Sequence, residues 1–474
     1  MTYGECMYYI SILALLIISS CKTNALDFAF QTKFKRKNPN IVIVSLKDLG
    51  VSDIGMYGGD INTPNIDYLI ENGVLLTRHY STANTETDQR AILFANQNDE
   101  AVCEKSLVSM IREHGYKTYH IGNWDLNGGK YGSIKNCGFQ QYFSQINDEQ
   151  YNVNGRKKIY VDMDYDFYQK LMTKYIASNI YSAKPFFMYA NLNSPNENPI
   201  KDDNSYRSKY EKSYQMGYEE LSRKRYKRIK TRNRDIAPSK LYLDKNVPKW
   251  NRLSEQERDQ QIEMMVKYSS SVDQLDHNLG KLMNYLQSLN ELNNTIIILS
   301  ASNSLDEDEP QSKKNHWNQL TDFKKTKKGS LYEGSLRSTA IVYYPDKIKR
   351  RKIVHNTTSL ENLLPSVLKW TSLESSQYED YIDVAELSRK DKSHLFTPLS
   401  DNRKYAEDII FASTPDNTAL IKGNWKIIKT AGTRSKWMLV NTENDISESK
   451  DYSSSHPKVK QDLIDIYNKQ QQAH

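Results

Sequence analysis

The chain contains short, unbroken hydrophobic runs separated by longer amphipathic stretches. The run Asn40–Leu46 is rich in Ile and Val and shows no alternation, which is typical of a strand buried on both faces of a sheet. Pro185–Ala190 and Thr295–Leu299 have the same character, and Tyr116–Gly122 has the composition of a further strand. These runs predict the inner strands of one large sheet.

The stretches between these runs carry helix signals. Thr63 followed by Pro64 is typical of a helix start, because Pro is tolerated at the first helical position. Lys105–His114 is a short amphipathic segment, and Ser254–Leu289 has helical periodicity over a much greater length. Because strands alternate with helices, we expect a mainly parallel α/β sheet flanked by helices.

The last part of the chain changes character. Two short strand-like segments, Ala419–Lys422 and Trp425–Lys429, precede a helix-like segment that begins at Pro457. We therefore predict a small C-terminal α+β subdomain over residues 401–474, after an α/β domain over residues 26–400.

One apolar run lies close to the N-terminus. Met7–Ser20 has the length of the hydrophobic region of a signal peptide and is short for a membrane span. Small residues follow, so we predict a signal peptide over residues 1–25, whose cleavage leaves no transmembrane segment. The alternative is an uncleaved anchor, because no Lys or Arg precedes the run.

Secretion changes how the cysteines and the sequons are interpreted. Cleavage leaves Cys103 and Cys137, and two cysteines in an oxidising compartment predict one disulfide. Asn-x-Thr sequons at Asn293 and Asn356 predict N-glycosylation in the same compartment. We expect a secreted, extracellular protein, with the lysosome as the alternative.

Positive charge is concentrated in one segment. The 474 residues carry 65 Lys and Arg against 58 Asp and Glu, a net charge of +7. Residues 207–234, within a basic insert at about 203–248, hold 11 Lys or Arg against three Glu. This insert predicts binding of polyanions such as sulfated glycosaminoglycans or anionic cell surfaces, whereas a nucleic-acid partner conflicts with the signal peptide.

A solvated charged helix or a flexible insert explains the same segment equally well. Its tyrosines at positions 206, 210, 214 and 218 have i, i+4 spacing, which predicts one stripe on one helix and more often marks a packing surface than a ligand platform. The residues predicted to bind polyanions are Arg223, Lys224, Arg225, Lys227 and Arg228.

Several of these segments together resemble the sulfatase family, most of all its arylsulfatase B-like branch. The similarity begins with Pro39–Val44, continues through Asn62–Asp67 and Gly73–Tyr80, and reaches Leu364–Ser366 in the family's order. The resemblance implies an alkaline-phosphatase-like α/β fold. Such a fold has a large, mixed, mostly parallel sheet flanked by helices and a smaller C-terminal antiparallel sheet.

The resemblance also implies where the reacting residues would lie, and the nucleophile is changed. Family sulfatases oxidise a cysteine in a C-x-P-S-R motif to formylglycine, whose hydrate attacks the sulfur of a sulfate ester. The corresponding segment runs from Glu86 to Arg90, so a glutamate stands at the nucleophile position and the arginine is retained. A glutamate cannot be oxidised to an aldehyde, so the covalent route of the family is closed.

The metal-ligand positions implied by the resemblance are also altered. Asp48 and Asn303 are retained, whereas Lys47 and Ser302 stand where the family has aspartates. Calcium requires six to eight oxygen ligands, several of them anionic. We expect Lys47 to replace the metal by pairing with Asp48 and Glu86.

The remaining polar positions follow the same trend. Where the family has a sulfate-binding lysine and two histidines, this chain has Asn123, Asp125 and Asn193, and only Lys328 is retained. We predict a catalytically inactive pseudo-sulfatase that acts by binding and needs no cofactor. The alternative is an active, calcium-dependent sulfuric ester hydrolase with a rewired site. The sequence predicts no oligomeric state.

Overall fold

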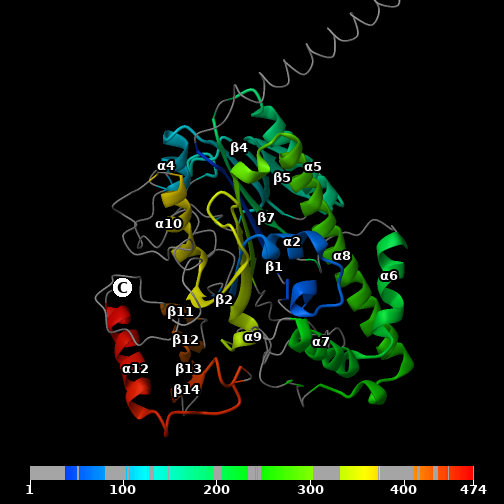
Figure 1. Ribbon diagram of the computed structural model, residues 1–474, viewed down its shortest axis with the longest axis vertical. Coiled ribbons are helices and arrows are strands. Elements are labelled where there is room, and N and C mark those ends of the chain that lie inside the picture. Colours follow the sequence, from blue (N-terminus) through cyan, green and yellow to red (C-terminus); the bar gives the residue numbers. More distant parts are fainter. Residues whose placement is uncertain are drawn as a thin grey trace, which may run out of the picture.

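The computed structural model shows two sheets with helices packed against them (Figure 1). The residues that it describes are 38–47, 49–50, 53–80, 103, 106–124, 126, 133–147, 149–182, 184–193, 195, 204–232, 241, 243, 247–302, 331–371, 373, 409–413, 417–430, 436–446 and 448–472. The predicted signal peptide and the boundary near residue 400 lie outside these residues. In the described part of the chain, no helix is long and apolar enough to cross a membrane.

The larger sheet has ten strands, and its inner strands are mostly parallel. Strand β9 runs antiparallel to both of its neighbours, and two antiparallel strands form the far edge. In spatial order the strands are β10 (Lys352–Thr358), β2 (Val74–Tyr80), β9 (Arg337–Tyr343), β8 (Thr295–Ser302), β1 (Asn40–Lys47), β7 (Phe186–Leu192), β3 (Lys117–Asn123), β4 (Gln141–Gln145), β5 (Gln150–Val153) and β6 (Arg156–Ile159). The predicted mixed, mostly parallel sheet is confirmed.

The two faces of this sheet are covered by different hydrophobic cores, which explains why β1 is apolar throughout. Val42 and Val44 point into one core, whereas Ile41 and Ile43 point into the other. The first core is completed by α2 (Pro64–Glu71), α5 (Tyr165–Ser178) and α8 (Glu255–Ser288). The second is completed by α4 (Leu107–Glu113) and α10 (Leu360–Trp370).

The helix starts confirm part of what the sequence predicts. Ser254 and Glu257 form a capping box at the start of α8, which stabilises the long predicted helix. At α2, Pro64 is the first helical residue as expected, but the Thr63 side chain does not cap the helix. Its hydroxyl instead accepts the Gly55 N–H at 2.9 Å.

The C-terminal part forms the second sheet. Strands β11 (Ile409–Ser413), β12 (Asn417–Lys422), β13 (Trp425–Thr430) and β14 (Met438–Asn441) are antiparallel, and α12 (Pro457–Gln472) packs against them. This arrangement confirms the predicted α+β character. The small sheet and α12 lie at the lower end of the molecule in Figure 1, on the side opposite α7 (Tyr218–Arg232).

The basic insert contributes two helices rather than one. After α6 (Asn204–Tyr214), Gly217 adopts a positive φ of 79°, and α7 begins at Tyr218. The predicted single tyrosine stripe is therefore wrong at its last member. Tyr210 and Tyr214 are buried, and their hydroxyls contact Asp273 and Ser269 of α8, so this part of the stripe is a packing surface.

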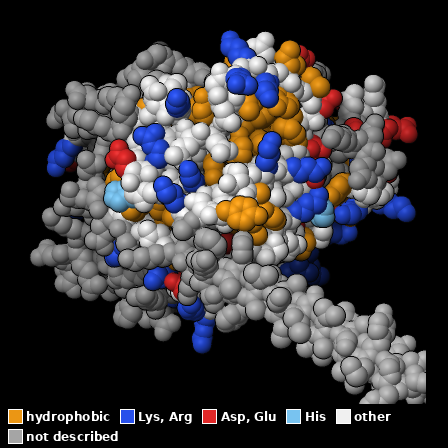
Figure 2. Space-filling model, turned by 90° about the horizontal axis from the view of Figure 1, so that it is seen from above, with side chains coloured by type: hydrophobic (Ala, Val, Ile, Leu, Met, Phe, Trp, Pro, Cys, Tyr) orange, Lys and Arg blue, Asp and Glu red, His pale blue; other side chains and the backbone are white. Residues whose placement is uncertain are grey.

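The end of the molecule that is uppermost in Figure 1 has a mixed surface. Hydrophobic side chains gather there, with Lys and Arg side chains around them (Figure 2). Large hydrophobic side chains that are exposed among the described residues include Ile159, Val161 and Tyr181.

Candidate functional site

Four positions predicted from the family resemblance lie along one edge of the large sheet. Strands β8, β1, β7 and β3 are consecutive and parallel, so their carboxyl ends meet at that edge. Lys47 ends β1 and is in register with Ser302, which ends β8. Asn123 ends β3, and Asn193 directly follows β7. Because neighbouring strands lie about 5 Å apart, the four positions span roughly 15 Å.

Two hydrogen bonds fix the backbone at this edge. The Asn191 side chain donates to the Asn123 carbonyl at 3.1 Å, which ties the ends of β7 and β3 together. The Tyr165 hydroxyl, from the first residue of α5, donates to the Asn193 carbonyl at 2.8 Å. A helix and two strands therefore hold the two asparagines in place.

The other predicted site residues cannot be placed. Outside the described residues lie Asp48, Glu86, Arg90, Asp125, Asn303 and Lys328. The side chains of Lys47 and Ser302 are likewise not described, although their backbones are. The expected pairing of Lys47 with Asp48 and Glu86 therefore stays a prediction.

Two of the four implied metal positions, Lys47 and Ser302, do not match calcium. Calcium is held by carboxylate, carbonyl and water oxygens. At the two register-paired positions the chain instead offers an ammonium, which cannot ligate a metal, and a neutral hydroxyl. Among the described residues, no group of three His, Cys, Asp or Glu side chains could hold a metal ion.

The segment that follows β1 contains a buried ionic cluster that the sequence analysis did not predict. Arg225 of α7 is only 3% exposed, and its Nη1 donates to Asp53 Oδ1 at 2.6 Å. Its Nε donates to Asp60 Oδ1. The Tyr268 hydroxyl of α8 donates to the second Asp53 oxygen at 2.9 Å. Helix α7 is thus attached to the segment that leads away from the strand edge.

Electrostatics explain why this cluster is tolerated in the interior. Burial alone would raise the pKa of Asp60, but the facing Arg225 guanidinium outweighs burial and holds this pKa below its usual value. Burial alone would lower the pKa of Arg225, but the two carboxylates outweigh burial and raise this pKa, so the guanidinium stays charged. The prediction that Arg225 binds polyanions is therefore wrong, because two of the chain's own aspartates occupy its guanidinium.

The sequence does hold a signal for this burial. The inward side of α7 carries Tyr218, Leu221, Ser222, Arg225 and Ile229, which have the spacing of one helix face. The arginine thus falls on an otherwise largely apolar stripe. The net charge of the segment does not reveal this periodicity, because it depends only on composition and not on the position of each residue around the helix.

The outward side of α7 keeps most of the predicted cationic residues. Arg223, Lys224 and Lys227 are exposed, and Lys230 extends the same surface toward the end of the helix. Arg232 is also exposed, but it follows Arg225 by seven residues and therefore lies on the same side of the helix as Arg225. Arg228 is only partly exposed, because its Nε donates to the Gly58 carbonyl at 2.7 Å. We call Arg223, Lys224, Lys227 and Lys230 the cationic face of α7.

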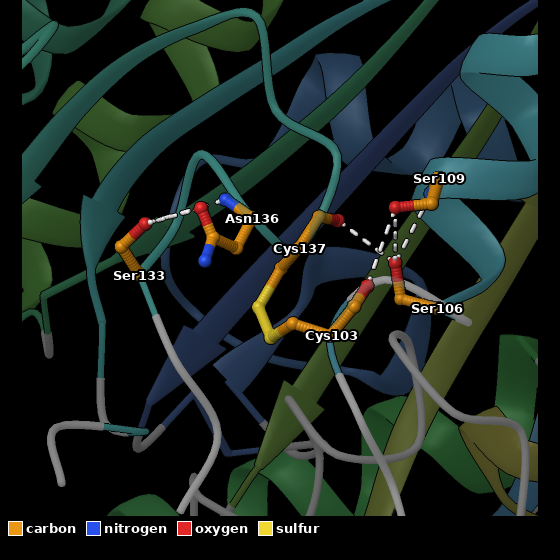
Figure 3. Close-up of a disulfide and its surroundings, with 6 residues drawn as sticks. All are labelled: Cys103, Ser106, Ser109, Ser133, Asn136 and Cys137. Carbon is orange, nitrogen blue, oxygen red and sulfur yellow. Dashed lines mark hydrogen bonds between the residues drawn. A yellow bond between two sulfur atoms is a disulfide. The ribbon is translucent and has the colours of Figure 1, made fainter. Parts of the chain in front are cut away.

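The predicted disulfide between Cys103 and Cys137 is present (Figure 3). Two serines at the start of α4 hold its ends, because Ser106 Oγ donates to the Cys137 carbonyl at 2.8 Å and Ser109 Oγ donates to the Cys103 carbonyl at 3.3 Å. The bond joins the segment before α4 to the turn before β4, and both cysteines are part of the second hydrophobic core.

The two predicted glycosylation sites differ in exposure. Asn293 is exposed in a short 3-10 helix, η5 (Leu292–Asn294), ahead of β8. Asn356 lies half-buried in β10, the edge strand of the large sheet. Of the two, Asn293 is therefore the more accessible to a glycan.

Comparison with known proteins gives consistent matches. The family profile named Sulfatase matches residues 39–373. An uncharacterised sulfatase of Schizosaccharomyces pombe is 23% identical over 531 residues, which cover 93% of this chain and 94% of the relative. An arylsulfatase of Klebsiella aerogenes is 22% identical over 314 residues, which cover 57% of this chain and 67% of the relative.

Solved structures show the same fold. Ps i-CgsB in complex with k-i-k-neocarrahexaose aligns with a TM-score of 0.64 at 17% identity, covering 91% of this chain and 92% of that protein. A protein solved with its substrate D-glucosamine-2-N,6-O-disulfate aligns with a TM-score of 0.63 at 17% identity, and the alignment covers 92% of this chain and 98% of that protein.

Proposed function

We propose that this chain, which belongs to the sulfatase family, is secreted, does not hydrolyse sulfate esters and acts by binding sulfated polyanions. The observation that supports the loss of hydrolysis is the register pairing of Lys47 with Ser302. Two positions at which the family binds its metal through aspartates are thus both replaced, and they stand side by side.

Changes elsewhere in the sequence support the loss of turnover. Glu86 cannot be matured to formylglycine, and Asn123 and Asn193 stand where the family has a cation and a histidine. Removing a single catalytic nucleophile can already slow an enzyme by about a millionfold. Simultaneous loss of nucleophile, metal ligands and acid–base groups leaves no route to efficient catalysis.

The cationic face of α7 supports the binding role. Its four basic side chains project from one rigid helix whose inward side is buried in the protein. Cations fixed on a rigid element attract a polyanion without a large loss of side-chain and loop freedom on binding. Solved relatives have been captured with a carrageenan-type oligosaccharide and with a sulfated glucosamine, which makes sulfated glycans the first polyanions to test.

A direct assay tests the loss of hydrolysis. The purified chain, coexpressed with the formylglycine-generating enzyme, is offered methylumbelliferyl sulfate with and without added calcium. We expect no release of the fluorophore above a no-protein control under either condition. Release that depends on calcium would overturn the proposal and favour the active, rewired hydrolase.

Heparin chromatography tests the binding role. Deleting the insert is unsuitable, because it would leave Asp53 and Asp60 buried without Arg225. The double variant Lys224→Glu/Lys227→Glu changes only exposed side chains, and we expect it to elute at clearly lower salt than the wild type. The matched control is Lys157→Glu/Lys158→Glu on the exposed edge strand β6. Equal shifts for both pairs would show that α7 is not the binding surface.

A further inference from the structure

A cavity of about 340 Å³ lies between helices on one side of the large sheet, and none of its described walls comes from the strand ends. The start of α2, helix α6 of the insert and the middle of α8 each contribute to it. Its described lining residues are Asn62, Pro64, Asn65, Ser205, Tyr206, Lys209, Asp273, Asp276 and His277.

The charged groups of this cavity are matched within the protein. Asp276 Oδ1 accepts the backbone N–H groups of Asn65 at 3.1 Å and Ile66 at 2.8 Å, so this carboxylate caps α2. Lys209 Nζ lies 2.9 Å from Asp273 Oδ2. Lys209, Asp273 and Asp276 therefore each have a partner within the protein.

Hydrogen-bonding capacity nevertheless remains. Asp273 is 3% exposed, and its bonds from Lys209 and Tyr210 both end on Oδ2. Within the described part of the chain, Oδ1 of this buried side chain accepts no hydrogen bond. The side chains of Asn62 and His277 are exposed and likewise make none with the described residues. The side chains of Asn62 and His277 can each donate and accept hydrogen bonds.

The cavity also has an apolar wall. The Tyr206 ring lines it, and Lys209 Nζ lies 5.0 Å from the centre of this ring. The lysine ammonium thus already occupies the place between the ring and the carboxylate that a small cationic ligand would take. The cavity walls carry two carboxylates, Asp273 and Asp276, and one ammonium, Lys209, so their net negative charge disfavours an anionic ligand. A neutral ligand with several hydroxyls fits the remaining donors and acceptors.

We propose that this cavity binds a neutral monosaccharide unit. Sugar hydroxyls would donate to Asp273 Oδ1 and exchange hydrogen bonds with Asn62 and His277. The volume is at the small end of ligand pockets, roughly 300–1,000 Å³, as a single sugar requires. Because α6 supplies Tyr206 and Lys209, the site exists only with the insert.

Saturation-transfer NMR with a panel of neutral methyl pyranosides tests this site on the full mature chain. We expect at least one of them to bind the wild type and to bind the double variant Asn62→Ala/His277→Ala about tenfold more weakly, since that variant removes two hydrogen-bonding side chains. Both residues are exposed and have no internal bonds among the described residues, so the variant should fold normally. The matched control is Gln287→Ala, an exposed residue near the end of α8.

Three results would overturn the proposal. They are binding of none of the sugars, sugar binding that the double variant leaves unchanged, and preferential binding of ethanolamine, a small ammonium compound, over every sugar. Heparin retention is measured on the same variant and should not change. Failure of the sugar site is therefore distinguishable from failure of the polyanion surface.

Discussion

At the scale of single residues, Arg225 is a buried member of the basic insert that is paired with two carboxylates. It places one guanidinium between the buried carboxylates of Asp53 and Asp60. Without it, Asp60 would keep only the more distant Arg228, whose Nη2 lies 3.8 Å from Asp60 Oδ1. An uncompensated buried charge costs far more than a surface ion pair contributes. Arg225 therefore belongs to the structural core, although it lies in the most basic stretch of the sequence.

Replacing this arginine gives a sharp prediction. Arg225→Met keeps much of the side-chain volume and removes the charge, and we expect the free energy of unfolding to fall by about 3–5 kcal/mol. Urea unfolding followed by circular dichroism measures the change. Lys224→Met, its exposed neighbour, should alter stability by less than about 0.5 kcal/mol. Similar small effects for both variants would mean that the buried pairs contribute little.

Asp276 is a second residue whose environment has a measurable consequence. Burial raises its pKa to about 6, and the N–H donors of Asn65 and Ile66 offset burial only in part. Because the folded-state pKa exceeds the usual 3.8, folding favours the protonated carboxyl. Its contribution to stability is complete below pH 3.8 and is lost as the pH rises through about 6.

This titration can be isolated with Asp276→Asn. The stability advantage of the wild type over the variant should shrink by about 2–3 kcal/mol between pH 4 and pH 7, measured by urea unfolding at each pH. The negative charge of Asp67 on α2 also raises this pKa, and the titratable groups that line the same pocket are Lys209, Asp273 and His277. Asp259→Asn, at an exposed position of α8, is the matched control. An advantage that is constant or grows with pH would contradict the prediction.

At the scale of elements, α7 has two faces with separate roles. Its inward face holds the segment after β1, and its outward face carries the cationic residues. The contact is close at Gly58, which has a φ of 84° and would place an added Cβ 2.8 Å from the Ile229 nitrogen and 2.9 Å from the Arg225 carbonyl oxygen. Helix α7 thus packs against the glycine backbone directly.

Two glycine variants separate this packing from backbone strain. At Gly58 an added Cβ would both strain the backbone and clash with α7. At Gly423, where φ is 57°, it would strain the backbone only, because no atom lies within 4 Å of the added Cβ. We expect Gly423→Ala to lose about 1–2 kcal/mol of stability and Gly58→Ala to lose about 1–3 kcal/mol more. Thermal and urea unfolding report both losses. Equal losses would show that α7 can move away without cost.

At the scale of the whole molecule, a buried ammonium joins the two sheets. Lys426 of β13 is 0% exposed and lies 3.1 Å from Glu333 and 2.9 Å from Glu448. Glu333 begins α9 (Glu333–Leu336), which leads directly into β9 of the large sheet. Arg78 of β2 adds hydrogen bonds to the Gly423 carbonyl and the Thr442 hydroxyl of the small sheet. These contacts couple the C-terminal sheet to the main body.

Removing the ammonium should weaken that coupling. Lys426→Met leaves two buried carboxylates facing each other, and we expect a loss of about 3–5 kcal/mol together with unfolding of the small sheet ahead of the large one. Differential scanning calorimetry would then show two transitions instead of one. Lys436→Met, at an exposed position of the same part of the chain, is the control. A single transition at the wild-type temperature would contradict the prediction.

The sequence by itself determined several inner strands of the large sheet and the family. Unbroken Ile and Val runs can be accommodated only by strands buried on both faces, and β1, β7 and β8 appear where such runs occur. The motifs that resemble sulfatases also fixed where the altered positions fall, because they are tied to strand ends. For that reason the sequence alone was enough to identify Lys47 and Ser302 as altered positions at strand ends.

The tertiary structure decided which side chains meet. Arg225 finds Asp53 and Asp60 at sequence separations of 172 and 165 residues, and no local pattern specifies such partners. Helix α2 is likewise capped by Asp276, 210 residues away from Ile66, rather than by the adjacent threonine. Hydrophobic periodicity places a residue on a face, but the packing of helices and strands decides what that face contacts, and hence whether a charge becomes a surface group or part of the core.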